Sequence, residues 1–130
     1  MPTSIVTHRK SAYINQSGRC YYCSLPMWEK DLELFSKKYG VKTTEALRLK
    51  STAEHLHSRQ DGGKNPKDNI VAACVFCNQH RHYMRPAPEP SAYKKIVLKQ
   101  LRNGYWHKKV IVQRILLALM IERSELPINS

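Results

Sequence analysis

An acidic residue beside a histidine, followed by two polar residues one helical turn apart, can build a site for a divalent cation. Glu54 and His55 are adjacent, and Asn78 and His82 are four residues apart. Residues with that spacing share one face of a helix. A carboxylate, an amide oxygen and an imidazole give a cation three protein ligands and leave positions for water and a phosphate oxygen. We therefore predict that Glu54, Asn78 and His82 bind a catalytic divalent cation, Mg²⁺ or another.

His55 is the candidate general base. Neighbouring residues of a strand point to opposite sides, so His55 need not share the cation with Glu54 and can face the attacking water. An imidazole has an ordinary pKa of about 6.5, which suits proton transfer at neutral pH. An isolated histidine is more often a hydrogen-bonded core residue. The catalytic interpretation of His55 therefore depends on the residues around it.

Four cysteines form two Cys-x-x-Cys pairs, Cys20 with Cys23 and Cys74 with Cys77. Four thiolates in this arrangement suit a closed, tetrahedral Zn²⁺ site. Reduced thiols without metal are one alternative. A redox-active dithiol is another, although neither pair lies in a βαβ pattern. We predict a structural zinc site with no open position, so the chemistry must lie elsewhere. Tyr22, inside the first pair, is expected only to pack against it.

Short elements must position these residues. The pattern predicts strands at about 52–56 and 70–74, a connecting loop rich in glycine and asparagine, and a helix from Asn78 to about Arg85. Further helices are expected at 5–17, 31–39, 43–50, 92–103 and 107–123. The expected fold class is α+β, with a small ββα metal core held by the four-cysteine zinc site and additional helices on both sides.

The predicted domain organisation has three parts. Residues 1–85 form the core, with a helical insertion at about 29–50, and 86–90 form a stiff Pro-rich linker. Residues 91–130 form a basic and apolar helical extension. Its last helix is apolar almost all round, so we expect it to be buried in its own domain or against a partner chain. A homodimer through this helix is therefore one expectation.

The charge of the chain indicates a polyanionic partner. Twenty-two Lys and Arg residues against ten Asp and Glu give 130 residues a net charge of +12. Nucleic acid is the simplest partner for such a charge. The N-terminus lacks the apolar region of a signal peptide, and no apolar run approaches the roughly 20 residues needed to cross a bilayer. We expect a cytoplasmic protein, where paired cysteines more often hold metal than form disulfides.

The segment from Thr52 to His82 closely resembles the HNH endonucleases, in particular the subgroup with a four-cysteine zinc site. Glu54-His55 matches the family's pair of metal ligand and general base. Asn69 matches the middle Asn, which in that family holds the loop and orients the base. Asn78 and His82 match later metal-ligand positions, and Gly62-Gly63 matches the loop glycines. The resemblance implies a ββα-metal fold and hydrolysis of DNA phosphodiester bonds, with His55 and Asn69 in the catalytic machinery.

Basic residues flank this segment and are candidates for phosphate contacts with double-stranded DNA: Arg59, Lys64, Lys67, Arg81 and Arg85. Contacts to phosphates position a duplex without reading its sequence and make binding salt-dependent. For the loop residues, an ordinary solvated charge is the competing interpretation.

Two other functions stay open on the sequence alone. The first is a non-catalytic, zinc-stapled DNA-binding module. The second is an interaction protein whose apolar last helix pairs with a partner, with an incidental basic surface. The metal-dependent endonuclease is favoured because a binding module needs no base beside an open metal site.

Overall fold

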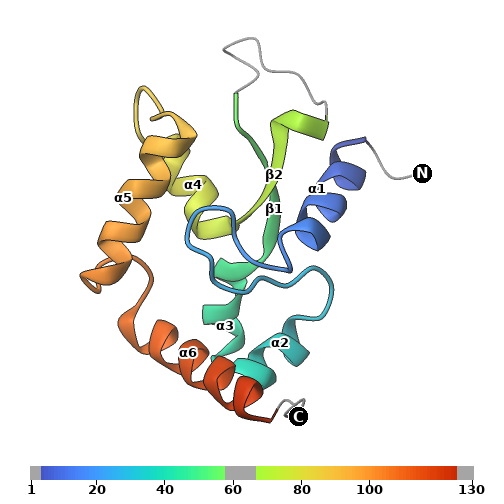
Figure 1. Cartoon of the computed structure of the whole chain (residues 1–130), viewed down its shortest axis with the longest axis vertical. Helices are drawn as coiled ribbons and strands as arrows, with labels where there is room; N and C mark the ends of the chain where they lie inside the picture. The colour runs from blue at the N-terminus through green and yellow to red at the C-terminus, as the bar shows by residue number, and fades with distance from the viewer. Residues whose placement is uncertain (1–3, 58–66, 126–130) are drawn as a thin grey trace, which may run out of the picture.

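The computed structural model describes residues 4–57 and 67–125 and shows a mixed α+β fold built around one pair of strands (Figure 1). Strand β1 (Ser51–His55) runs antiparallel to β2 (Ile70–Cys74), with Glu54 opposite Val71. The short 3₁₀ helix η3 (Lys67–Asn69) leads into β2, whose first residues are the β-branched pair Ile70 and Val71. The predicted fold class and strand pair are confirmed.

Helix α4 (Val75–Tyr83) follows β2 directly. It begins at Val75, ahead of the predicted start at Asn78, because Cys74 is its N-cap and the Cys74 sulfur accepts a hydrogen bond from the Cys77 amide. The second cysteine pair therefore spans the junction between strand and helix. This junction fixes the direction in which α4 leaves the strand pair.

Helix α1 (Ser4–Asn15) lies along the strand pair (Figure 1). Just after it, the Gln16 side chain donates to the Ala72 carbonyl at 2.8 Å and accepts from the Ala72 amide at 2.9 Å. The same carbonyl accepts from the Tyr21 amide at 3.0 Å. Ala72 is thus bonded on the edge of β2 that β1 does not cover, and the segment with the first cysteine pair is attached to that edge.

The predicted helical insertion contains α2 (Leu32–Tyr39), α3 (Thr43–Ala46) and the 3₁₀ helix η1 (Leu47–Leu49). The Asp31 side chain caps α2 by accepting from the Leu34 amide at 3.0 Å. Gly40 ends α2 with a φ of 66°, a conformation that glycine adopts without strain. The insertion leads straight into β1 and contributes buried side chains to the core, namely Phe35, Tyr39, Ala46 and Leu49.

Helices α5 (Pro90–Arg102) and α6 (Lys109–Ser124) form the C-terminal extension. Helix α6 packs against α2 (Figure 1). Ile111 and Ile115 of this last helix are buried, whereas five of its large apolar side chains are exposed: Val110, Leu116, Leu117, Met120 and Ile121. One face of α6 therefore joins the core and another faces outward.

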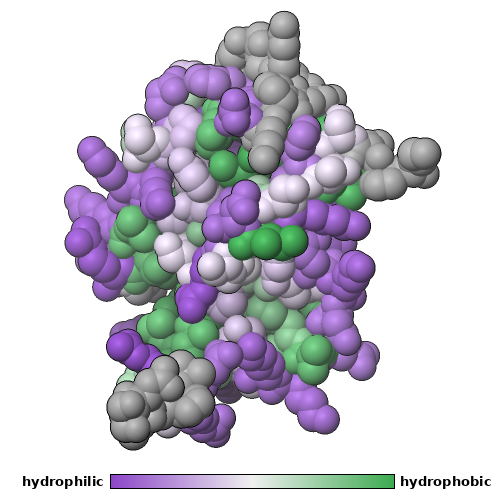
Figure 2. Space-filling view, turned by 45° about the vertical axis from the view of Figure 1, so that its right-hand side comes forward, coloured by the Kyte–Doolittle hydropathy of each residue, from purple (hydrophilic) through white to green (hydrophobic). Residues whose placement is uncertain are grey.

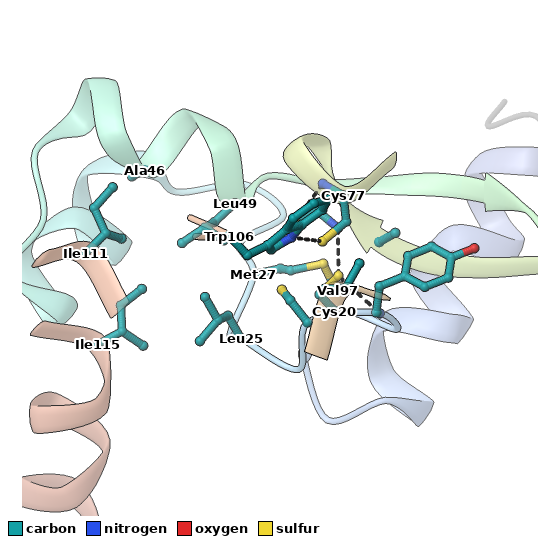
Figure 3. Packing of buried hydrophobic residues seen from close by; sticks show 14 of the residues in the cluster. Cys20, Leu25, Met27, Ala46, Leu49, Cys77, Val97, Trp106, Ile111 and Ile115 are labelled. Carbon is teal, nitrogen blue, oxygen red and sulfur yellow. Dashed lines mark hydrogen bonds between the residues drawn. The ribbon is translucent and has the colours of Figure 1, made fainter. Parts of the chain in front are cut away.

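One cluster of buried residues joins all these parts, and it includes the four cysteines. Figure 3 shows Cys20 and Cys77 packed among apolar side chains of the core and of the C-terminal extension. On the face seen in Figure 2, apolar areas are separated by polar ones. Among the helices of the described chain, none combines the length and apolarity needed to cross a membrane.

Candidate metal centre and active site

Four cysteine sulfurs meet where the first Cys-x-x-Cys pair approaches the start of α4. The Sγ atoms of Cys20, Cys23, Cys74 and Cys77 lie within 4.8 Å of one another, and all four residues are buried and free of disulfide bonds. In a tetrahedral site with Zn–S bonds of about 2.3 Å, the sulfurs are about 3.8 Å apart, so a small contraction reaches that geometry. The four cysteines form a metal-binding cluster whose donor set suits zinc.

Backbone amides donate to two of the sulfurs. Cys20 Sγ accepts from the amides of Tyr22 at 3.4 Å and Cys74 at 3.3 Å, and Cys74 Sγ accepts from the Cys77 amide at 3.4 Å. Such N–H donors stabilise negative charge on sulfur. The two turns that carry the cysteines are therefore shaped to hold thiolates.

Two side chains from the connection between α5 and α6 approach the other sulfurs. The Trp106 Nε1–H donates to Cys77 Sγ at 3.3 Å, and His107 Nε2 lies 3.4 Å from Cys23 Sγ. Figure 3 shows the Trp106 indole nitrogen directed at Cys77. Both residues are buried, and burial lowers the pKa of the His107 imidazole to about 4. A neutral His107 ring carries one N–H donor at neutral pH.

The thiols differ in acidity. Burial, reinforced by the neighbouring cysteines, raises the pKa of the Cys74 thiol well above its usual value, and the pKa of Cys77 is raised in the same way. Burial also acts to raise the pKa of Cys20, but hydrogen bonds from the other three thiols outweigh it and lower that pKa well below its usual value. A bound cation requires thiolates, so metal binding releases protons from this cluster.

Glu54 is the buried acid of the predicted active site, with 1% of its surface exposed. Its Oε2 atom accepts hydrogen bonds from the Tyr22 hydroxyl at 3.0 Å and from Arg81 Nη1 at 3.3 Å, and its Oε1 atom lies 2.9 Å from His82 Nε2. Burial and then the charge of Glu54 raise the pKa of Tyr22 well above its usual value, so the phenol remains a donor. These partners compensate the cost of burying a carboxylate.

The contact between Glu54 and His82 has the spacing of two ligands of one cation. In octahedral coordination with bonds of about 2.1 Å, adjacent ligand atoms are about 3.0 Å apart. The observed separation of Glu54 Oε1 and His82 Nε2 is 2.9 Å. The His82 side chain is 38% exposed, so a cation and a substrate can reach it from solvent.

Asn78 lies one turn before His82 on α4. Its Nδ2 atom donates to Thr52 Oγ1 at 3.0 Å and to the Ala53 carbonyl at 3.2 Å, the two residues that precede Glu54 on β1. The structure therefore brings all three predicted cation ligands to the contact between β1 and α4.

His55 is partly exposed whereas Glu54 is buried, as expected for neighbours on a strand. The chain just beyond His55 is held by Asn69, which is itself buried. Asn69 Oδ1 accepts from the His57 amide at 2.9 Å, Nδ2 donates to the His57 carbonyl at 3.1 Å, and the Asn69 carbonyl accepts from the Leu56 amide at 2.9 Å. Asn69 thus occupies a position from which it fixes the end of β1.

The sequence predicts a phosphate contact for Arg81, but the structure buries this residue, which is 4% exposed. Besides Glu54, its guanidinium binds three backbone carbonyls: those of His55 at 3.1 Å, Leu56 at 3.1 Å and Pro88 at 3.0 Å. All three guanidinium nitrogens are used inside the chain. The geometry therefore assigns Arg81 to holding Glu54 and the end of β1, in place of a phosphate contact.

The other predicted phosphate contacts are distributed differently. Arg85 is exposed just after α4. Arg59 and Lys64 lie outside the described residues, as do the Gly62-Gly63 pair and the side chain of Lys67. Helix α5 adds exposed basic side chains that include Lys95, Lys99 and Arg102.

Sequence reasoning missed the contacts of Tyr22, Trp106 and His107. Tyr22 was expected to pack against the first cysteine pair, and its bond to Glu54 was not foreseen. One signal in the sequence was available: Trp106 and His107 stand next to each other in the short segment that follows Gly104. A tryptophan next to a histidine in such a connection indicates burial against something specific.

Comparison with known proteins agrees with this geometry. The family model described as HNH endonuclease matches residues 43–84. That segment runs from α3 through β1 and β2 to the end of α4, and it contains the buried acid, the adjacent histidine and the second cysteine pair. No curated protein and no solved structure gives a significant match. Residues 43–84 of the chain therefore match the HNH endonuclease family.

Proposed function

We propose that this protein is a metal-dependent endonuclease that hydrolyses phosphodiester bonds of double-stranded DNA at the contact between β1 and α4. The observation that carries the proposal is the 2.9 Å contact between Glu54 Oε1 and His82 Nε2, with His55 next along the strand. It lies inside the segment matched by the HNH endonuclease family model. Two neighbouring cation ligands, of which His82 is reached from solvent, beside an imidazole are what single-metal phosphodiester hydrolysis requires.

In this mechanism Glu54, Asn78 and His82 hold the divalent cation, Mg²⁺ or another. When bound, the cation supplies positive charge to the scissile phosphate and to the leaving oxygen. His55 accepts the proton of the attacking water, and the products carry 3′-hydroxyl and 5′-phosphate ends. Asn69 keeps His55 in place by fixing the residues that follow it.

Tyr22 and Arg81 orient the carboxylate of Glu54 so that its Oε1 atom faces His82. Both donate to Oε2, the other oxygen. Because Oε2 is engaged by these two donors, Oε1 is the oxygen that would be presented to a cation together with His82. Positioning of this kind lowers the reorganisation needed when the cation binds.

The four-cysteine cluster, in the same proposal, binds one Zn²⁺ with a structural role. All four donors come from the protein, so no position is left for a substrate. DNA is held by basic side chains through its phosphates, with Arg85 and the exposed lysines of α5 as candidates and Arg59, Lys64 and Lys67 kept as predictions from the sequence. Dimerisation through the exposed face of α6 also stays a prediction.

Plasmid nicking tests the proposal. Purified protein is incubated with supercoiled plasmid and Mg²⁺ or Mn²⁺, and wild type is compared with His55→Ala. We expect the variant to bind DNA normally and to lose cleavage by a factor of about 10² or more, the contribution of a positioned base. The matched control is His57→Ala, because His57 is an exposed histidine two residues further along. The control should cut like wild type.

Two results would overturn the proposal. Equal cutting by wild type and His55→Ala would remove His55 from the chemistry. No cutting by wild type with any divalent cation, with DNA binding retained, would favour the non-catalytic, zinc-stapled DNA-binding module.

A further inference from the structure

The C-terminal extension reaches the metal-binding cluster through its interhelical connection. Trp106 Nε1 is 3.3 Å from Cys77 Sγ, and His107 Nε2 is 3.4 Å from Cys23 Sγ. One contacted sulfur belongs to each Cys-x-x-Cys pair. Both contacting side chains are buried, with 8% and 5% of their surfaces exposed. The extension therefore touches both halves of the cluster at once.

Backbone amides and side chains of the extension contact different sulfurs of the cluster. Backbone amides of the cysteine turns serve Cys20 and Cys74. From the extension, the Trp106 N–H donates to Cys77 Sγ, and His107 Nε2 lies beside Cys23 Sγ. Four thiolates around one divalent cation carry a net negative charge in a buried place, and each N–H donor reduces its cost. The turns alone supply donors to only part of this charge.

Further contacts hold the C-terminal extension against the four-cysteine cluster. The Tyr93 hydroxyl of α5 donates to the Cys77 carbonyl at 2.6 Å. The Tyr93 ring meets the Tyr22 ring edge-on, with centroids 4.8 Å apart, and Trp106 meets Phe76 in the same way at 5.2 Å. These rings bury the sulfurs from water, so a lost N–H donor would not be replaced by solvent.

We propose that Trp106 and His107 donate N–H hydrogen bonds to the zinc-bound sulfurs of Cys77 and Cys23. Through these bonds they couple zinc retention to docking of the C-terminal extension. The docked extension slows zinc loss, and bound zinc holds the extension in place. The two effects share one coupling free energy, because linkage between two binding equilibria is reciprocal. This role is independent of whether the active site cleaves DNA.

Zinc release from the full-length, zinc-loaded protein measures the first effect. Release into an excess of a chromogenic chelator is followed for wild type and Trp106→Phe, which keeps an aromatic ring and removes the N–H. We expect zinc release from Trp106→Phe to be about 10- to 100-fold faster than from wild type, the effect typical of losing a hydrogen-bond partner of a metal ligand. Trp28→Phe is the matched control, since it loses an indole N–H bond to the Ala46 carbonyl away from the sulfurs. The control should release zinc like wild type.

A second pair of variants separates the donor from simple packing. His107→Gln keeps an N–H donor, whereas His107→Met has a similar length and none. We expect zinc release near the wild-type rate for the glutamine variant and fast release for the methionine variant. Equal release from both would overturn the proposal, even if Trp106→Phe fails to fold.

Hydrogen exchange of the zinc-loaded proteins measures the second effect, the stabilisation of the docked extension by the zinc site. In His107→Met, amides of α6 should exchange faster than in wild type, while amides of α1 should not change, because α1 packs on the strand pair. Unchanged exchange of α6 in His107→Met, or equal acceleration in α1 and α6, would contradict coupling through this contact.

Discussion

The Tyr22 hydroxyl donates a hydrogen bond to Glu54 Oε2 at 3.0 Å, although the two residues are 32 positions apart. Tyr22 lies between Cys20 and Cys23, so the metal-binding turn itself touches the proposed catalytic carboxylate. A single side chain therefore connects the two centres.

Replacing Tyr22 with Phe should weaken both stability and cleavage. The buried Glu54 carboxylate loses a donor, which should lower the free energy of unfolding by about 1–3 kcal/mol. Cleavage should require more Mn²⁺, because Glu54 is less well oriented toward the cation. Urea denaturation and a Mn²⁺ titration of plasmid nicking measure these effects.

Tyr93→Phe is the control for that variant. Tyr93 is also fully buried, but its hydroxyl donates to the Cys77 carbonyl. It should lose comparable stability while its Mn²⁺ requirement stays that of wild type. Identical Mn²⁺ requirements in Tyr22→Phe and wild type would contradict the orienting role of Tyr22.

Arg81→Met should be strongly destabilising, because it leaves the Glu54 carboxylate buried without its cationic partner. Removing one member of a buried ion pair costs about 3–5 kcal/mol. The exposed Arg85→Met should change the free energy of unfolding by less than about 0.5 kcal/mol. Chemical denaturation of both variants makes the comparison.

A double-mutant cycle locates the origin of that cost. In Glu54→Gln the carboxylate charge is absent, so adding Arg81→Met should cost less than in wild type, by a coupling of about 0.5–3 kcal/mol. A purely additive cycle would mean that the contacts of Arg81 with backbone carbonyls carry its whole effect.

Asn69→Ala should release the end of β1. Both ends of the amide bind His57, so stability should fall by about 1–3 kcal/mol and nicking should fall with it, since His55 loses its fixed neighbours. Asn69→Asp keeps the acceptor for the His57 amide and should retain more activity than Asn69→Ala. The exposed neighbour Asp68→Ala should behave like wild type, and a loss of activity there equal to that of Asn69→Ala would contradict the assignment.

Elemental analysis should find about one tightly held Zn²⁺ per chain, as four-cysteine sites of this type do. Stripping it with a strong chelator should abolish cooperative thermal unfolding followed by circular dichroism, because the cluster joins the first cysteine turn to α4. Added Zn²⁺ should restore the transition, and Mg²⁺ should not, since thiolates prefer the softer ion. A metal-free protein that unfolds at the same temperature would contradict the structural role of the cluster.

Local patterns were enough to predict the elements around the site. The i, i+4 spacing of Asn78 and His82, the adjacent acid and histidine, and the two cysteine pairs all concern residues close in sequence. The strand pair followed from a short, bounded segment at 52–56 and a short apolar run at 70–74, on either side of a loop that contains two glycines. The start of α4 was placed late, because only the structure shows the Cys74 sulfur acting as its cap.

Long-range partners explain what the sequence could not give. A basic residue is usually exposed, so Arg81 was assigned to DNA, and its burial depends on carbonyls that β1 and the linker bring to it. The contact of His107 with Cys23 spans 84 positions, and no local pattern encodes such a distance. The last helix was expected to be buried in its own domain or against a partner chain, and composition alone does not reveal how much of its surface its own neighbours cover.

The position of Gln16 has a consequence for how molecules of this protein meet one another. A two-stranded sheet has an unpaired edge on each side, and strands of other molecules can pair with such edges. At the edge formed by β2, the backbone N–H and C=O of Ala72 are both already bonded to the side-chain amide of Gln16. Gln16 thus takes the place of a third strand and discourages intermolecular sheet growth at this point, without lengthening the sheet.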